Sequence, residues 1–467
     1  MKPRHLDLLV TLSSPTLSPD GEQAVFAASR PSFDVDDHVG RIWSVATAGR
    51  GRPRPLTRGT SDLAPQLSPD GHTVAFLRGG VDARPQLAIV SAEGGEPRIV
   101  TDAPLGVDEF VWSRDSRELA FVARMPEEGR YGTLEGVPAE REDPRLIVGN
   151  KYQANGIGYI RDRPRGIYLL EVPSLDEEPW LEPRGRAATG TEEEPRDNTT
   201  LGGRRGIPQA RLLTPLEADC RQPEFTPDGK RVCFTAALHA GEDSDLRSMI
   251  HRVPVTGGEP VLVAGGAEAT WAWSRPRFSR DGRTLFLLAE HLGESGLDFV
   301  GSAKAVAALA VDAEPGTEPR ILTDPVTSDY EAPWSFLEPF GEESVLAPAR
   351  VRGCGELHVI SPEGRVHVLV KGPKVVSAAA ERSGVSVAVV SEATRPMELA
   401  RVAEGRLVRL TDFARPLVAA ATPVEPRELT IQGEDGNDIH GWVFVPKGRG
   451  SHPVLLNIHG GPFSNFN

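Results

Sequence analysis

The stretch "LSPDGHTVAFLRG" runs from Leu67 to Gly79 and decides the fold. An apolar residue ends one strand, and Ser-Pro-Asp-Gly then makes a turn, because proline fixes φ, aspartate hydrogen-bonds its own backbone and glycine takes the positive-φ position. The residues after the turn alternate, as in a half-buried strand. Two further apolar runs, "QLAIV" (86–90) and "RIVT" (98–101), complete a unit of about four short strands.

The same unit recurs through most of the chain. Copies begin at Leu17, Leu67, Trp112, Phe225, Phe278 and, in degenerate form, Leu337 and Ala379. Four-stranded units that repeat every ~40–60 residues are typical of a β-propeller, whose blades bury their faces against one another. A sandwich built from the same strands would not need a repeating turn motif. Seven copies therefore predict a mainly β fold, a seven-bladed β-propeller over residues 1–412.

One wide gap separates the third copy from the fourth and predicts an insertion over residues 125–208. Its part from Arg145 to Pro173 has apolar runs, so we expect that part to be ordered. Residues 174–208 are charged, rich in glycine and proline and low in complexity, and such segments bury too little apolar surface to fold. We expect them to be flexible.

Composition narrows the class of protein. The 467 residues carry a formal net charge of -14, which argues against nucleic acid as a partner, because phosphate binding needs a concentrated positive face. The three cysteines are neither even in number nor clustered, so we expect no disulfide framework and no metal site. Cys233 alternates like a buried strand residue. The start has no signal-peptide pattern and no stretch nears ~20 apolar residues, which predicts a cytoplasmic protein without a membrane partner.

The composition of the sequence changes near residue 413. A Pro/Ala-rich connector (413–427) precedes two predicted strands that flank a turn at Gly433–Gly436. The apolar run Val454–Ile458 then suits a strand buried on both faces, and it leads directly into His-Gly-Gly-Pro. Hairpin, buried strand and glycine loop together indicate the first strands of an α/β-hydrolase domain, over residues 428–467.

Taken together, the propeller repeats, "DGNDIHGWVFVP" and "LLNIHGGP" resemble the prolyl oligopeptidase family of serine peptidases. The insertion's "KYQANGIGY" is similar to a stretch in the family's acylaminoacyl-peptidase branch. This resemblance covers essentially the whole chain. Repeats alone would be less specific, since TolB-type and WD-repeat-like propellers share them.

The resemblance implies an oxyanion-hole loop at the end of the chain. Gly461 would offer a backbone N–H to the developing oxyanion, with His459, Gly460 and Pro462 as loop support. The family's triad serine, aspartate and histidine all follow this loop in chain order, and no Gly-x-Ser-x-Gly elbow occurs in residues 1–467. We therefore expect no catalytic residue in this chain, and expect it to be the N-terminal portion of a longer enzyme that is inactive alone.

The parent enzyme implied by the resemblance hydrolyses short or N-acylated peptides through a serine ester, with the propeller gating access to a cavity over the hydrolase domain. It needs no cofactor and no metal. Members of this branch often self-associate, so the resemblance is compatible with a homo-oligomer. The alternative from another class is a stand-alone propeller that serves as a binding or assembly module.

The resemblance does not decide which end of the peptide the enzyme recognises, because the family also includes dipeptidyl, endo- and carboxypeptidase-like forms. A free amine would need paired carboxylates, and a terminal carboxylate would favour arginine, whose fork binds it bidentately. The candidate pairs are Glu127-Glu128, Glu177-Glu178 and Glu342-Glu343. The candidate substrate-binding arginines are Arg161, Arg163 and Arg165 in the insertion and Arg275 beside Trp273.

Overall fold

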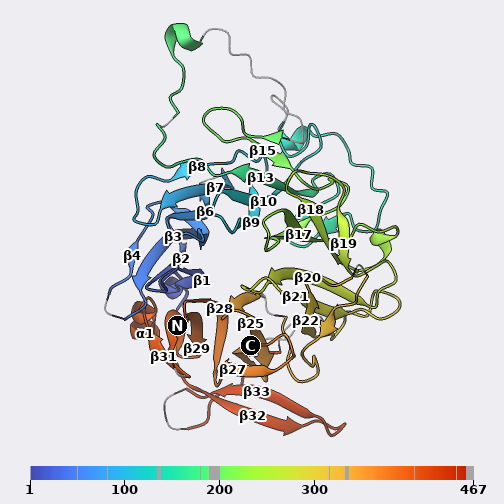
Figure 1. The fold of residues 1–467 in the computed structure, drawn as a ribbon. Helices are drawn as coiled ribbons and strands as arrows, with labels where there is room; N and C mark the ends of the chain where they lie inside the picture. Colours follow the sequence, from blue (N-terminus) through green and yellow to red (C-terminus); the bar gives the residue numbers. More distant parts are fainter. Residues whose placement is uncertain are drawn as a thin grey trace.

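The computed structural model describes residues 2–49, 51–80, 83–133, 138–178, 180–188, 200–314, 316–331, 336–403, 405–446, 448 and 450–458. Seven β-sheet blades stand around a common centre (Figure 1), which confirms the predicted propeller and its seven repeats. In each blade the first strand lies innermost, and the following strands run antiparallel toward the rim.

The blades follow one another along the chain. Blade 1 comprises β1 (Thr11–Leu17), β2 (Gln23–Ser32), β3 (Asp37–Ala46) and β4 (Arg54–Pro55). Blade 2 comprises β5 (Ser61–Leu67), β6 (Thr73–Gly80), β7 (Ala83–Ser91) and β8 (Arg98–Ile99). Blade 3 comprises, from the centre outward, β9 (Val107–Trp112), β10 (Glu118–Arg124), β13 (Arg165–Glu171), β15 (Ala210–Leu212) and β14 (Thr200–Leu201). Blade 4 comprises β16 (Arg221–Phe225), β17 (Arg231–Ala236), β18 (Met249–Pro254) and β19 (Val261–Ala264). Blade 5 comprises β20 (Trp271–Phe278), β21 (Thr284–His291), β22 (Lys304–Ala310) and β23 (Arg320–Ile321). Blade 6 comprises β24 (Glu338–Phe340), β25 (Ser344–Val351), β26 (Cys354–Ile360) and β27 (Val366–Val370). Blade 7 comprises β28 (Lys374–Arg382), β29 (Val385–Glu392), β30 (Arg395–Ala403) and β31 (Arg406–Arg409).

The repeated turn owes its sequence to local hydrogen bonds. In blade 2 the Ser68 hydroxyl donates to Asp70 Oδ1 over 2.6 Å, and the same oxygen accepts from the His72 N–H at 3.0 Å. The Thr73 N–H closes the turn on Ser68 Oγ at 3.0 Å. Because these bonds need only residues within the turn, the motif recurs blade after blade. The corresponding pairs are Ser18–Asp20, Ser113–Asp115, Thr226–Asp228 and Ser279–Asp281.

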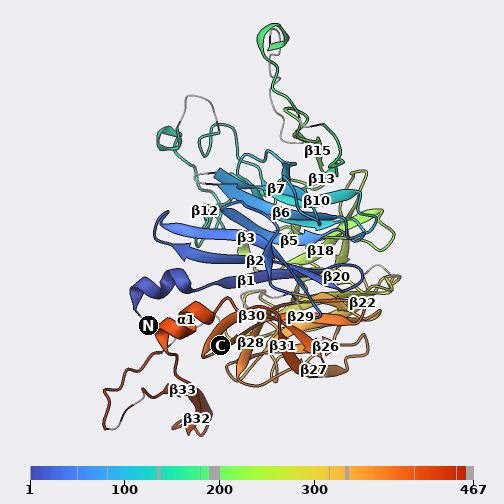
Figure 2. The ribbon, with the colours of Figure 1, turned by 90° about the vertical axis from the view of Figure 1, so that its left-hand side faces the viewer.

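The two faces of the ring differ. The face that carries the Ser/Thr-Asp turns, here the turn face, also carries the connections between third and fourth strands, since the Val255 N–H donates to the Lys230 carbonyl at 3.0 Å. On the opposite face the innermost strands begin and the second strands connect to the third. We call this the start face. The short helices η1 (Pro3–Leu8) and α1 (Arg415–Ala421) and the C-terminal hairpin lie on its side (Figure 2).

The ring closes without exchanging a strand between its ends, because blade 1 uses only N-terminal strands and blade 7 only C-terminal ones. The seam is apolar instead. Leu12 and Phe26 of blade 1 pack in one buried cluster with Val387 and Leu399 of blade 7. Beyond β31, Phe413 crosses the seam and lies edge-on to Phe26 and to Trp43, with ring centroids 6.2 and 5.0 Å apart.

The predicted insertion leaves blade 3 in two excursions. Residues 125–164 connect the second and third strands on the start face and include η2 (Ala139–Arg141), β11 (Gln153–Ala154) and β12 (Gly158–Tyr159). Residues 172–199 connect the third strand to β14 and include η3 (Gly185–Ala188). Residue 179 and residues 189–199, within the segment expected to be flexible, lie outside the described residues. Near its start that segment is held by an ion pair of 2.8 Å between Arg98 and Glu177.

The C-terminal segment confirms one prediction and corrects another. β32 (Pro426–Gln432) and β33 (Asp438–Phe444) pair across the expected turn, where the Gly433 N–H donates to the Asn437 carbonyl at 2.8 Å. The strand predicted at Val454–Ile458 is absent: these residues have no regular secondary structure, and Val454 is 93% exposed. The physical reason is that no described strand lies beside this run to accept its hydrogen bonds.

Among the described residues, no helix is both long and apolar enough to cross a membrane.

Candidate functional site

A cavity of about 1110 Å³ occupies the centre of the ring and is lined by the innermost strands of all seven blades. Its wall mixes charged side chains with apolar ones such as Leu12, Phe110 and Trp112. Five arginines and five glutamates line it: Arg114, Arg275, Arg277, Arg280, Arg382, Glu109, Glu224, Glu338, Glu342 and Glu381. Such a lining suits a polar, extended ligand such as a peptide better than an apolar small molecule.

Some of these charges connect neighbouring blades. Arg277 of blade 5 binds Glu224 of blade 4 at 2.8 Å and Glu338 of blade 6 at 3.0 Å. Nearer the turn face, Arg280 of blade 5 pairs with Glu381 of blade 7, whose carboxylate also accepts from the Gly384 N–H at 2.8 Å. These side chains hold the ring together and are occupied by protein partners.

Bulges shape the cavity wall in four blades. Ser14, Ala64, Gln222 and Arg275 all have positive φ, between 48° and 57°, and each stands directly before a proline. At each of them the pairing of the innermost strand with its neighbour shifts register. A non-glycine residue in this region carries a cost of about 1 kcal/mol, so the surrounding contacts must hold it there.

At the start-face end of the cavity, side chains of blades 3 and 4 supply those contacts for Gln222 and Arg275. Glu109 Oε1 accepts from the Gln222 N–H at 2.7 Å, and Gln222 Oε1 accepts from the Arg275 N–H at 2.9 Å. The Thr235 hydroxyl donates to the same amide oxygen at 2.9 Å. Burial raises the pKa of Glu109, although the Gln222 N–H and nearby arginines oppose the rise. The chain of bonds fixes the backbone of Gln222 and Arg275 and thereby aims their side chains.

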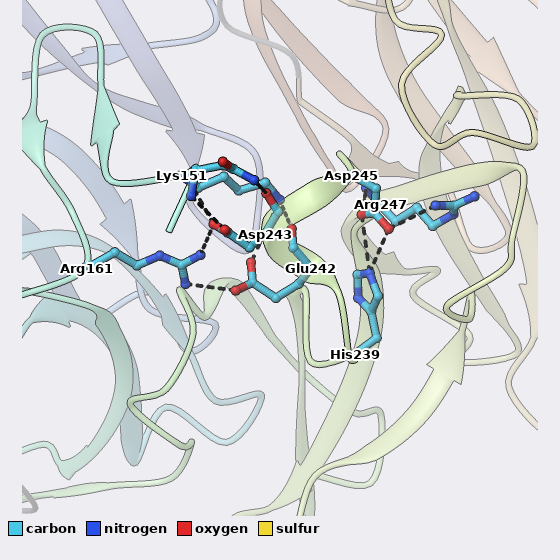
Figure 3. Close-up of polar contacts among 8 residues, drawn as sticks. Lys151, Arg161, His239, Glu242, Asp243, Asp245 and Arg247 are labelled. Carbon is cyan, nitrogen blue, oxygen red and sulfur yellow. Dashed lines mark hydrogen bonds and ion pairs between the residues drawn. The ribbon is translucent and has the colours of Figure 1, made fainter. Parts of the chain in front are cut away.

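A second polar cluster joins the insertion to blade 4 (Figure 3). Asp243 accepts from the backbone N–H groups of Asn150 at 2.6 Å and Lys151 at 2.8 Å, and it pairs with Arg161 at 2.6 Å. Arg161 also pairs with Glu242 at 2.8 Å. The two backbone donors, followed by Arg161, lower the pKa of Asp243 to about 2. The carboxylate is thus ionised at neutral pH and docks the insertion on the start face.

The loop that carries Asp243, between β17 and β18, is itself braced from the other side (Figure 3). Asp245 accepts from His239 Nε2 at 3.0 Å and from Arg247 Nη1 at 2.9 Å, and all three side chains are nearly buried. η4 (Glu242–Ser244) lies between the two sets of contacts. The loop is therefore a rigid support for the insertion.

The structure places the four candidate substrate-binding arginines in different surroundings. Arg165 pairs with Asp108 at 2.7 Å and with Asp219 at 2.9 Å. Arg161 is committed to Glu242 and Asp243, as described above. Arg163 donates to the Tyr159 carbonyl at 2.7 Å and lies 4.3 Å from the centroid of the Tyr131 ring. Arg275 alone lines the central cavity. The oxyanion-hole residues expected from the resemblance, His459, Gly460, Gly461 and Pro462, lie outside the described residues.

Sequence reasoning missed Glu109, Gln222 and Arg221. Arg221 begins β16 and lines a smaller cavity of about 260 Å³ between the insertion and blade 4. A signal for this region was present: the dipeptides Ser14-Pro15, Ala64-Pro65, Gln222-Pro223 and Arg275-Pro276 stand at the same distance before four of the turn motifs. Their shared position predicts that they face the centre of the ring.

In the part of the chain that the structure describes, no group of three or more histidine, cysteine, aspartate and glutamate side chains could hold a metal ion.

Comparisons with known proteins find peptidases that are similar to this chain in sequence and in fold. No family model matches the chain. The chain is 26% identical to the uncharacterized peptidase YuxL of Bacillus subtilis over 97% of its own length and 65% of that protein. It is 20% identical to dipeptidyl-peptidase 5 of Porphyromonas gingivalis over 99% of its own length and 63% of that protein. The chain therefore spans somewhat less than two thirds of these curated relatives.

Solved structures show the same fold. The acylaminoacyl peptidase of Pyrococcus horikoshii superposes with a TM-score of 0.66 at 15% identity, over 95% of this chain and 59% of that one. The β-propeller domain of the trilobed protease of Pyrococcus furiosus, described as having an open velcro topology, superposes with a TM-score of 0.55 at 13% identity over 87% of this chain and 97% of that domain. The similarity thus covers the propeller portion of the peptidases.

Proposed function

We propose that this chain is the propeller-containing part of a serine peptidase of the prolyl oligopeptidase family, which hydrolyses short or N-acylated peptides. In this proposal the start face covers the catalytic domain, and the central cavity admits peptides and excludes folded proteins. The similarity of nearly the whole chain to peptidases that extend beyond it supports the proposal.

The observation that carries it is the apolar surface of the C-terminal segment. Along the hairpin, Ile431, Ile439 and Phe444 are 50 to 59% exposed, and Leu455 beyond it is 93% exposed. Contiguous exposed apolar residues mark a surface that another layer covers. We infer that β32 and β33 are the first strands of an α/β-hydrolase sheet, and that the rest of such a sheet and its helices would bury this apolar surface.

The hairpin is held on the start face, where a catalytic domain would follow. Arg352, in the turn between the second and third strands of blade 6, donates to Thr430 Oγ1 at 3.1 Å. Thr394, in the equivalent turn of blade 7, donates to Glu425 Oε1 at 3.0 Å. The docked insertion shares this face, so it would border the route between cavity and active site. We propose that it gates this route.

We expect the catalytic mechanism to be the one that the resemblance to the prolyl oligopeptidase family implies. A serine from the catalytic domain attacks the peptide carbonyl, and the Gly461 N–H donates to the developing oxyanion, one of two such donors. Removing a single oxyanion donor typically lowers kcat by about 10²–10³. Residues 1–467 would contribute access and positioning, and the triad would come from the catalytic domain.

A fluorophosphonate probe tests this proposal. We expect the native gene product that carries residues 1–467 to be labelled on one serine, whereas residues 1–467 alone should not be labelled. A stand-alone binding module predicts no labelling of either protein. Unlabelled native product that is folded and intact would overturn the proposal.

A further inference from the structure

An exposed turn of the insertion carries the dipeptide Asn155-Gly156, the one place in residues 1–467 where glycine follows asparagine. The turn joins β11 to β12, and the Ile157 N–H closes it by donating to the Ala154 carbonyl at 3.1 Å. Gly156 has a φ of 73°, the left-handed value that the third position of such a turn favours. The turn belongs to the motif "KYQANGIGY", to which the proposed function assigns no role.

Two groups of this turn that can react with each other are both unbonded. Within the described residues, the Asn155 side-chain amide and the Gly156 N–H take part in no hydrogen bond. A Cβ added at Gly156 would meet nothing within 4 Å beyond its chain neighbours, so this position is open on all sides. The glycines of the repeated turns differ, because the Gly71 N–H donates to the Ser68 carbonyl at 2.8 Å. The Gly156 nitrogen is therefore available for chemistry that the repeated turns hold back.

The other described asparagines lack one or both of these features. The Asn437 amide donates to Asp435 at 2.8 Å, and its N–H donates to the same carboxylate at 3.1 Å. Asn150 is followed by lysine, and its amide donates to a backbone carbonyl of blade 4 at 3.5 Å. Asn457 is exposed, and its amide makes no hydrogen bond within the described residues. However, Ile458 follows it, and the branched side chain crowds the backbone nitrogen.

The surroundings of the turn favour negative charge. Arg163 donates to the Tyr159 carbonyl at 2.7 Å and to the Ile157 carbonyl, so its guanidinium lies against the turn. Within the described residues Arg163 pairs with no carboxylate, whereas Arg145 and Arg161 each pair with two. A cation in this place stabilises both a deprotonated glycine nitrogen and a carboxylate formed from the asparagine.

We propose that Asn155 is a site of spontaneous deamidation. The Gly156 nitrogen loses its proton to solvent and attacks the side-chain carbonyl carbon of Asn155. The bond from that carbon to the amide nitrogen breaks, and ammonia leaves. The product is a five-membered succinimide, which water opens at either carbonyl to give aspartate or isoaspartate. Asparagine and water thus become a carboxylic acid and ammonia, and the reaction consumes no oxidant or reductant.

Either product changes the insertion. Both add one negative charge to a protein whose formal net charge is -14. Isoaspartate also lengthens the backbone by one methylene group, and the short pairing of Gln153 with Tyr159 and of Ala154 with Gly158 cannot keep its register around a longer turn. The backbone N–H groups that dock the insertion on Asp243 lie just before this hairpin, at residues 150 and 151. We therefore expect the modified insertion to dock less firmly.

Ageing of residues 1–467 in solution tests the site, with peptide mapping by mass spectrometry. We expect Asn155 to lose ammonia at least tenfold faster than Asn437 and Asn457, because Asn155 alone of the three precedes a glycine. The loss should be faster at pH 8 than at pH 6, since the attacking nitrogen must first give up its proton. Protein isoaspartate methyltransferase distinguishes isoaspartate from aspartate. Trypsin should cleave aged protein faster than fresh protein after Lys151.

Variants assign these changes to the turn. Asn155→Gln keeps an amide but would need a six-membered ring, so position 155 should stay unmodified and cleavage after Lys151 should not change with age. Asn437→Gln is the matched control, because it changes an exposed asparagine of another turn, and it should age as the wild type does. Thermal unfolding checks that both variants are folded. A synthetic peptide of residues 151–159 measures the same dipeptide without the fold.

The proposal is overturned if Asn155 stays intact in the folded protein while the peptide deamidates, because the turn would then protect the dipeptide. It is also overturned if Asn155 reacts no faster than Asn457, or if Asn155→Gln ages as the wild type does. None of these measurements involves peptide hydrolysis or fluorophosphonate labelling. The modification site and the proposed peptidase activity can therefore fail separately.

Discussion

Phe413→Ala should open the ring at the seam between blades 1 and 7. No strand is shared across this seam, so the apolar cluster and Phe413 contribute most of its closure, beside a hydrogen bond of 2.7 Å from the Ser383 hydroxyl to the Pro19 carbonyl. Truncating a fully buried phenylalanine costs about 3–5 kcal/mol, and Phe413 is half-buried, so roughly half of that applies. Losing its edge-to-face contacts with Phe26 and Trp43 adds about 0.5–1.5 kcal/mol each. The expected loss of stability at the seam is about 2.5–5.5 kcal/mol.

Hydrogen exchange read by mass spectrometry measures this locally, which matters because a large ring need not unfold in one step. A loss of 2 kcal/mol raises the exchange rate of amides that depend on seam opening about 30-fold. We expect this in β1–β3 and β28–β31, with little change in β16–β19 on the far side. Phe33→Ala, at a position 61% exposed in blade 1, is the control and should change exchange little. Uniform acceleration in all blades, or none at the seam, would refute the role of Phe413.

Three other predictions concern single groups. Because the folded pKa of Asp243 is depressed to about 2, its contribution to docking the insertion should be complete above pH ~4 and lost as pH falls through 2; Asp243→Asn should speed tryptic cleavage of the insertion at pH 7, and unchanged cleavage would contradict the docking. Burial raises the thiol pKa of Cys220 and of Cys233 to about 12, so iodoacetamide at pH 8 should modify the half-buried Cys354 first; equal rates would show that the blades open readily. Asp62→Ala should cost about 1.5–3 kcal/mol in denaturant unfolding, since it leaves the partly buried Arg78 without the carboxylate that it binds at 2.8 Å; a loss below 1 kcal/mol would show that water replaces the carboxylate.

The propeller could be predicted from sequence because its signal is local. The hydrogen bonds of Ser68 and Asp70 join residues within one turn, so the same letters recur wherever the turn recurs. The hairpin at Gly433–Gly436 was predictable for the same reason. Cys233 was read correctly as a packing residue, since strand alternation alone decides its burial.

The site depends on contacts between blades, which no local pattern encodes. Arg161 and Arg275 look alike as sequence letters, yet the Arg161 guanidinium pairs with Asp243 of another blade, whereas Arg275 is held through its backbone N–H by the Gln222 side chain. Glu109 gave no signal, because its carboxylate accepts the backbone N–H of Gln222, which is 113 residues away along the chain. The strand expected at Val454–Ile458 failed for a related reason: an apolar run becomes a strand only when another strand lies beside it.

The central claim, that the start face covers a hydrolytic domain, is tested most directly by amine-reactive cross-linking of the native gene product with mass-spectrometric mapping. Lys151 in the insertion and Lys371 before β28 stand on the start face, whereas Lys230 stands in a turn on the opposite face. We expect cross-links from Lys151 and Lys371 to residues beyond the propeller and none from Lys230. Cross-links from Lys230 alone, or a native product with no further domain to cross-link, would contradict it.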